Sequence, residues 1–396
     1  MMQVEARGLG IALQKVGTIL AFGVLPAALI VAFVVVTIGG SHPFYDFNGD
    51  IYEAGRAILH GRNPYDAAFL QHLVAIKNAG GSPSLVFAVP VYPAPTLLVF
   101  APLALFSTRL AGLLFTIGSV VALLWGLRLA GVRDWRCYGA ALLSWPTVEA
   151  VRLGALEPLL LLGLALVWKW RHRAATTGAI AGLIVPAKLF LWPVAGWALA
   201  TRRWRMIAFG VLVAVLVTLA AWAVIDFHGI RAYPTILGDD STLVRAAGVS
   251  WISAGAAIGV SSGAAEAVSL VVAFALLGLA WRLCRSGDEN GEARGFGVTI
   301  VAALVACPVV WAHYLVLLYL PVALICPTLS LLWFVPLLDY FSPVELTRGD
   351  IWEIVPALVI ELVVLLALWA PFPGITGLKL SRPQGSDRRG RNALLD

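Results

Sequence analysis

The feature that most limits what this chain can fold into is the length of its apolar runs. Residues 16–38 contain no charged side chain, and neither do residues 206–225. About 20 such residues are the length that an α-helix needs to cross the hydrocarbon core of a bilayer. Only 13% of the 396 residues are charged, against about a quarter in soluble domains. We therefore expect an all-α polytopic membrane protein.

Apolar segments recur along the chain, and several are short and separated only by a proline or a glycine. We expect about 10–13 membrane segments in one helical bundle, because half-helices are tolerated in a membrane where neighbouring helices bury them. The candidate segments are residues 16–38, 92–106, 111–129, 138–151, 155–169, 177–188, 189–200, 206–225, 264–283, 297–312, 313–326, 329–341 and 351–370. They predict a single membrane domain over residues 1–378, followed by a basic tail at 379–396 that we expect to be cytoplasmic and disordered.

Lysine and arginine in the short loops indicate the orientation, since cytoplasmic loops carry an excess of them. Basic clusters lie at 169–173, 202–205 and 282–285. With these clusters inside, residues 39–91 form the first extracytoplasmic loop, in which we expect two short amphipathic helices on the membrane surface. The basic stretch 128–136 is ambiguous, because two spans between residues 92 and 129 would place it outside. Either residues 92–106 are re-entrant or the charge rule fails there.

Several kinds of chemistry have no sequence to support them. There is no P-loop, no dinucleotide-binding glycine motif, no H-E-x-x-H and no G-x-S-x-G. The four cysteines lie singly in or beside apolar runs, with no metal-ligand spacing, and are interpreted as small core residues. The net charge of +6 is explained by the ends of spans rather than by affinity for nucleic acid. We expect no cofactor, no metal and no nucleic-acid partner, and a substrate that arrives through the membrane or from outside.

Ionisable residues inside or at the edge of a membrane are costly, so each is a candidate for function. Asp46 and Asp50 follow the first span directly. Asp50 stands immediately before the helical pattern of residues 51–60, which suits a helix cap. Asp46 is four residues too early for that cap and is the better candidate for a catalytic carboxylate.

Three further ionisable residues stand in otherwise apolar surroundings. Glu157 precedes a proline and is either a first-turn residue favoured by the helix dipole or a site residue, with Arg152 as a plausible partner. Lys188 is a lone cation between two prolines, which either meets an anionic phosphate or pairs with a buried carboxylate. His313 lies between aromatic residues and is either a core histidine or a ligand contact. A carboxylate base and cations at one membrane face suit a lipid-phosphate-linked substrate, whose phosphate departs as an acceptor hydroxyl loses its proton.

Five blocks, taken in order, resemble glycosyltransferase family 87, the polyprenol-phosphate-sugar-dependent mannosyl- and arabinosyltransferases of actinobacteria in the GT-C class. The resemblance extends over residues 42–341, and the ordered set is more specific than any one block. The blocks are FYDFNGDIYEAGRAILHGRNPYD, VYPAPTLLVFAPLAL, RLGALEPLLLLGLALVWKWR, AKLFLWPVAGWALATRRWR and CPVVWAHYLVLLYLP. The sequence departs from the family in having Asp50 where many members have an apolar or hydroxyl residue, and VYPAP where Y-P-P-P is commoner.

The resemblance implies a GT-C-type bundle and an inverting, metal-independent transfer on the extracytoplasmic face of the plasma membrane. The donor would be a polyprenyl-phosphate sugar, with mannose favoured over arabinofuranose, and the acceptor a cell-envelope glycolipid or polysaccharide. Carried over by motif, Asp46 is the general base, and the residues expected to bind the donor phosphate or sugar are Lys188, His313, Arg152, Glu157 and Tyr314. The residues expected to shape the first loop or to face the acceptor are Asp50, Arg56, Asn63, Tyr65 and Tyr92. A transporter of lipid-linked sugars is the alternative from another class, and it would spread its buried charges across the membrane rather than collect them on one face.

Overall fold

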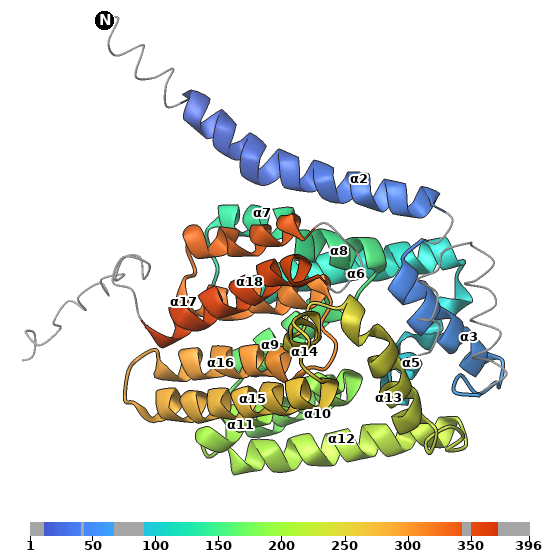
Figure 1. Ribbon diagram of the computed structural model, residues 1–396. Coiled ribbons are helices and arrows are strands. Elements are labelled where there is room, and N and C mark those ends of the chain that lie inside the picture. The colour runs from blue at the N-terminus through green and yellow to red at the C-terminus, as the bar shows by residue number, and fades with distance from the viewer. Residues whose placement is uncertain (1–11, 41–42, 67–90, 343–349, 371–396) are drawn as a thin grey trace, which may run out of the picture.

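A computed structural model describes residues 12–40, 43–66, 91–342 and 350–370 (Figure 1). Over these residues every regular element is a helix, and the expected all-α membrane fold is confirmed. The expected second amphipathic helix, within residues 67–90, and the tail at 379–396 lie outside the described residues.

Several α-helices border short π-helices (η1 and η2) or 3₁₀-helices (η3 to η7). The elements, in chain order, are η1 (Leu20–Val24), α2 (Leu25–Gly39), η2 (Phe47–Tyr52), α3 (Glu53–Leu59), α5 (Ala94–Phe100), η3 (Ala101–Leu105), α6 (Thr108–Leu129), α7 (Trp135–Leu143), α8 (Trp145–Leu153), α9 (Glu157–Lys169), α10 (Ala174–Ala187), η4 (Leu189–Leu191), α11 (Val194–Ala200), α12 (Trp204–Val224), α13 (Tyr233–Val244), η5 (Arg245–Ala247), α14 (Trp251–Ala257), α15 (Ser262–Arg285), α16 (Gly291–Ala306), η6 (Ala312–Leu318), α17 (Tyr319–Ile325), η7 (Leu331–Phe341) and α18 (Ile351–Trp369).

The apolar helices fall into two kinds by length. Five are long and apolar enough to cross a membrane, and the bent pair α8–α9 qualifies as a sixth when taken together. Five shorter apolar helices, of 10–17 residues, complete the set within the described part of the chain. The expected 10–13 segments therefore included both full spans and half-helices. The short ones do not need to meet lipid at both ends, because neighbouring helices cover them.

The long helices run roughly parallel across the view in Figure 1, with α3, α5 and α13 gathered at one end and the α15–α16 turn at the other. The protein has its most deeply buried layer around α16 and η6. Thirteen consecutive residues of α16, from Ala293 to Val305, are buried, and so are His313 to Leu318 of η6. By contrast, α2 and α12 are largely exposed, as expected for helices that face lipid.

Residues 92–106 contain no helix long enough for a full span. Residues Ala94–Leu105 form a short apolar pair of helices, and α6 is the one full-length span that follows. The first half of α6 packs beside the chain just after α2, where the ring centroids of Phe47 and Phe115 lie 4.7 Å apart. The other end of α6, at Arg128, therefore lies away from that region.

The first loop differs from expectation at Asp50. The chain turns into a helix by Tyr45 and continues through the wide turns of η2 into α3 without a break. Asp50 therefore lies inside a continuous helix and does not cap it, so the cap interpretation is wrong. The expected apolar face is confirmed, with Ile51, Ala54 and Ala57 buried. It packs on η3 inside the protein rather than only on a membrane surface, since a Cβ on Gly55 would lie 2.9 Å from the Ala101 Cα.

Candidate active site

Five ionisable side chains from distant parts of the sequence meet within the bundle. Asp46 comes from the helical residues directly before η2, Glu149 from α8, Glu157 from the start of α9, Lys188 from the junction of α10 and η4, and His313 from η6. Packing of η6 against α8 and α9 brings three of these elements together. Sequence separation gives no hint of this, since the cluster spans residues 46 to 313.

A sharp bend places two of the carboxylates. Gly154 ends α8 in the left-handed conformation, with φ of 70°, and α9 then leaves at 115° to α8. Pro158 lies in the first turn of α9, where its missing N–H costs nothing. The bend turns Glu149, from the middle of α8, and Glu157, from the start of α9, toward the same histidine.

His313 lies at the centre of the cluster. Its Nε2 is 3.8 Å from Asp46 Oδ2 and 3.6 Å from Glu157 Oε2, and its Nδ1 is 3.9 Å from Glu149 Oε2. Carboxylate oxygens therefore lie within 4 Å of both ring nitrogens. The ring also lies edge-on to Tyr314, with centroids 5.0 Å apart.

Lys188 lies between α10 and η4 in an extended conformation. Its ammonium donates to Glu157 Oε1. It lies 3.9 Å from the centre of the Tyr314 ring and 3.5 Å from the Tyr92 hydroxyl. The sequence left two partners open for Lys188, an anionic phosphate or a buried carboxylate. The structure shows the buried carboxylate, Glu157.

The five side chains differ in exposure. Asp46 and Lys188 retain 23% and 12% of their side-chain surface, whereas Glu157, His313 and Glu149 retain 0%, 3% and 3%. An approaching molecule thus meets a carboxylate and an ammonium first. Behind them, His313 and Glu157 form a buried polar layer that links the two.

Tyrosines line the same region. The Tyr65 hydroxyl donates to the Tyr92 carbonyl at 2.7 Å, and the Tyr65 ring stacks on Trp222 at 5.0 Å. The Tyr92 hydroxyl lies 3.5 Å from the ammonium of Lys188.

The other expected site residues occupy the first loop or its surroundings. The Asn63 carboxamide oxygen accepts from the Tyr65 N–H at 3.0 Å, which forms the turn expected from the GRNPY stretch. Arg56 is exposed and pairs with Glu53 at 4.0 Å, away from the cluster. Arg152, expected as a partner of Glu157, lies in the last turn of α8, and the direct partners of Glu157 are Lys188 and His313.

Glu149 and Glu361 are among the buried carboxylates that the sequence interpretation missed. Glu149 is one of the three around His313, and Glu361 of α18 accepts from the Trp251 indole N–H at 2.7 Å. Both stand in apolar surroundings, so the rule that singled out Glu157 would also have found them. Glu361 joins α18 to α14 and is not among the groups around His313.

The described residues contain no group of three or more His, Cys, Asp or Glu side chains placed to hold a metal ion. All four cysteines are free thiols; Cys137, Cys307 and Cys326 are buried core residues as expected, whereas Cys284 is only partly buried. The site as described offers a partly exposed carboxylate, a partly exposed cation and a histidine between carboxylates.

Comparison with protein families gives one finding. A family model described as glycosyltransferase family 87 matches residues 91–309, which is more than half of the chain. The matched region includes Glu149, Glu157 and Lys188, and it ends four residues before His313. No curated protein and no solved structure matches the chain.

Proposed function

The chain belongs to glycosyltransferase family 87, and from this premise we propose that it transfers a sugar from a polyprenyl-phosphate donor to a glycolipid or glycan of the cell envelope. Mannose is the favoured sugar. The enzyme is a multi-pass membrane protein with long apolar helices, so a donor and an acceptor carried by lipid can both reach it within the bilayer. The proposal places it in the plasma membrane of an actinobacterium, with its site on the extracytoplasmic face.

The observation that supports this proposal most strongly is the pairing of a partly exposed carboxylate with a partly exposed ammonium above one buried polar layer. Transfer with inversion needs both groups. The acceptor oxygen attacks the anomeric carbon, the bond from that carbon to the phosphate oxygen breaks, and the acceptor proton moves to a base. The departing polyprenyl phosphate gains one negative charge, which a nearby cation stabilises.

Asp46 is assigned the role of the base. It is the most exposed carboxylate of the cluster, and His313 stands behind it at 3.8 Å. A carboxylate base within reach of the acceptor hydroxyl typically contributes about 100- to 10,000-fold to the rate. His313, flanked by Glu149 and Glu157, is well placed to stabilise Asp46 before and after it takes the proton.

Lys188 is assigned to the donor phosphate. Its bond to Glu157 fixes the ammonium, and the Tyr314 ring lies against it. Tyr92 adds a neutral hydroxyl at 3.5 Å from the same nitrogen. A phosphate arriving at the exposed side of Lys188 would therefore meet a cation that is already oriented and partly desolvated.

The proposed orientation of the protein in the membrane rests on the distribution of its arginine residues. The end of the bundle away from Asp46 contains Arg171 and Arg203 in loops and Arg285 in the last turn of α15. Cytoplasmic ends of membrane proteins carry such an excess. We accordingly place Asp46 and Lys188 on the outer side. The collection of the charged groups around one histidine also favours an enzyme over a transporter, which would distribute them along a path.

The test compares transfer from two donors, radiolabelled polyprenyl-phosphate mannose and polyprenyl-phosphate arabinofuranose, by purified protein with envelope lipid extracts as acceptor. We expect transfer of mannose by the wild type and a loss of about 100-fold or more in Asp46→Asn, because an amide cannot accept the proton. Asp66→Asn, which alters an exposed carboxylate in the same loop, should keep the wild-type rate.

Transfer of arabinofuranose alone would replace the sugar in the proposal while keeping the mechanism. Full transfer by Asp46→Asn would overturn the assignment of the base. Uptake of donor into vesicles without transfer to any acceptor would favour the transporter instead.

A further inference from the structure

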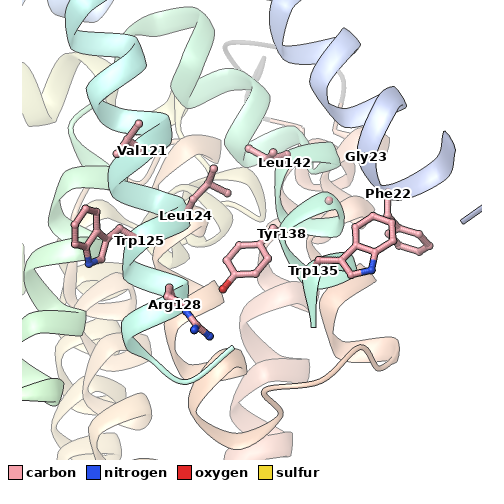
Figure 2. Close-up of a pocket in the computed structure, with 10 residues that line it drawn as sticks. Phe22, Gly23, Val121, Leu124, Trp125, Arg128, Trp135, Tyr138 and Leu142 are labelled. Carbon is pink, nitrogen blue, oxygen red and sulfur yellow. The ribbon is translucent and has the colours of Figure 1, made fainter. Parts of the chain in front are cut away.

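A groove of about 590 Å³ opens between the middle of the first span, the second half of α6 and α7 (Figure 2). Its walls are almost entirely apolar or aromatic. They include Phe22 from the first span, Leu124 and Trp125 from α6, and Trp135 and Leu142 from α7. Ligand-binding clefts of proteins commonly have volumes of about 300–1,000 Å³, so the groove is large enough for more than ordered water.

Glycine explains why the groove exists. Gly139 of α7 lies directly against the backbone of Phe22, where a Cβ would overlap the Phe22 carbonyl group. The two helices therefore touch closely at this point. The larger side chains on either side, Trp135 and Leu142, hold them apart and leave a trough.

The groove opens to the lipid-facing surface of the protein. Trp125 and Trp135 are 60% and 45% exposed at its rim. The first span, which forms one wall, is almost entirely exposed along its length. Whatever covers this apolar surface in a bilayer is therefore lipid, and the aromatic side chains at the rim are typical of the level of the headgroups.

One cation lies in the groove. Arg128, in the last turn of α6, is exposed and lines it beside Tyr138. Within the described residues no carboxylate pairs with Arg128. The neighbouring Arg136 is neutralised by Asp134 at 2.7 Å, so the local charge that remains is that of Arg128 and of Arg133, which is not part of the groove.

The groove is separate from the candidate active site. The first half of α6 packs beside Phe47, next to Asp46, whereas the groove lies along the second half. None of the residues around His313 lines it. By the charge rule, its Arg128 end faces the cytoplasmic leaflet.

We propose that this groove binds an anionic phospholipid of the cytoplasmic leaflet, with an acyl chain between Phe22 and Trp135 and the phosphate at Arg128. An apolar trough with a single unpaired cation at its edge matches an amphiphile that has one negative group and a long chain. The lipid bridges the first span to α6 and α7 and thereby holds a helix that the protein itself barely buries.

The experiment measures lipid binding by native mass spectrometry of the full-length protein in detergent, titrated with phosphatidylglycerol or phosphatidylcholine. We expect the wild type to bind phosphatidylglycerol in preference to phosphatidylcholine. Arg128→Gln should weaken phosphatidylglycerol binding about tenfold or more, because one charge-assisted contact is lost. Arg128→Lys should restore most of it, and Leu124→Trp, which fills the groove, should weaken binding of both lipids.

The matched control is Arg133→Gln, which removes an exposed arginine from the loop after α6, outside the groove. It should bind phosphatidylglycerol as the wild type does. Equal loss in Arg128→Gln and Arg133→Gln would show a diffuse surface charge and overturn the proposal, as would unchanged binding in both Arg128→Gln and Leu124→Trp. Unfolding midpoints of the variants in lipid-free detergent serve as the check that each one is folded.

Discussion

At the scale of one residue, the sequence indicates that Lys188 needs a partner but does not identify that partner. A lone cation in an apolar stretch must have a partner, because a charge without one is expensive inside a membrane. The partner, Glu157, is 31 residues away and lies on another helix. The same pair also leaves part of the ammonium exposed, so a carboxylate partner and a phosphate ligand are compatible roles.

The first prediction separates those roles. Lys188→Met should lower stability by about 3–5 kcal/mol, because it leaves the Glu157 carboxylate buried without its ammonium, and it should raise the KM for the donor. The double variant Lys188→Met/Glu157→Gln removes both charges and should regain most of the stability but not the affinity for donor. Thermal unfolding in detergent and donor titration measure the two effects.

Lys169→Met, which alters an exposed lysine at the far end of α9, is the control and should leave both quantities unchanged. A double variant with the wild-type KM would mean that Lys188 acts only through its pairing with Glu157. The assignment of Lys188 to the donor phosphate would then be wrong.

At the scale of elements, the bend between α8 and α9 decides where the carboxylates of the site lie. Gly154 makes the bend because its φ of 70° is in the left-handed region that favours glycine. It is also pressed against the first loop, since a Cβ there would lie 2.7 Å from the Phe47 Cβ and 3.2 Å from the Phe44 Cβ. Phe47 directly follows Asp46, so the bend supports both halves of the site.

A second prediction uses this contact. Gly154→Ala should reduce sugar transfer strongly, because a methyl group must displace Phe47 and with it Asp46. Gly61→Ala is a matched control: its φ of 67° imposes the same backbone strain, of about 1–2 kcal/mol, but it has open space around it. It should cost stability alone and retain the wild-type rate per folded molecule.

Transfer rates normalised to the folded fraction, which size-exclusion chromatography provides, distinguish the two variants. Equal activity of Gly154→Ala and Gly61→Ala would show that Phe47 moves without consequence and that Gly154 serves only the helix end.

At the scale of the whole molecule, the two ends of the bundle are built differently. At the end away from the site, Glu292 Oε1 of α16 forms ion pairs with Arg203 Nη2 at 2.8 Å and Arg171 Nε at 3.6 Å. Both guanidinium groups also lie over tryptophan rings, at 4.6 Å for Arg203 on Trp197 and 4.2 Å for Arg171 on Trp168. This cluster joins the loops that follow α9 and α11 to the start of α16.

The last prediction tests whether that end is purely structural. Glu292→Gln should lower the unfolding midpoint by only about 2–4 °C or less, because partly exposed pairs are each worth roughly 1 kcal/mol or below. Transfer by the folded protein should not change, since Glu292 is not among the residues around His313. A large fall in rate without a fall in the midpoint would indicate that the two ends are coupled.

Much of the architecture follows from the sequence alone. Apolar runs of about 20 residues can only be membrane helices, because a backbone in lipid must satisfy its hydrogen bonds internally, and this predicted the fold class. The rule that ionisable residues are costly in a membrane singled out Asp46, Glu157, Lys188 and His313. Blocks quoted from the sequence pointed to glycosyltransferase family 87, which the family match confirms.

The tertiary structure decided what depends on distance between remote segments. Hydropathy patterns contain no information about contacts between distant residues. They therefore could not reveal that Glu157 pairs with Lys188 or that Glu149 lies beside His313. Local propensity placed a helix start at Asp50, but packing of Ile51 and Ala54 continued the helix back to Tyr45. The sequence determined which residues had to find partners, because burying a charge alone is too costly. Which partners they found depended on how the helices pack.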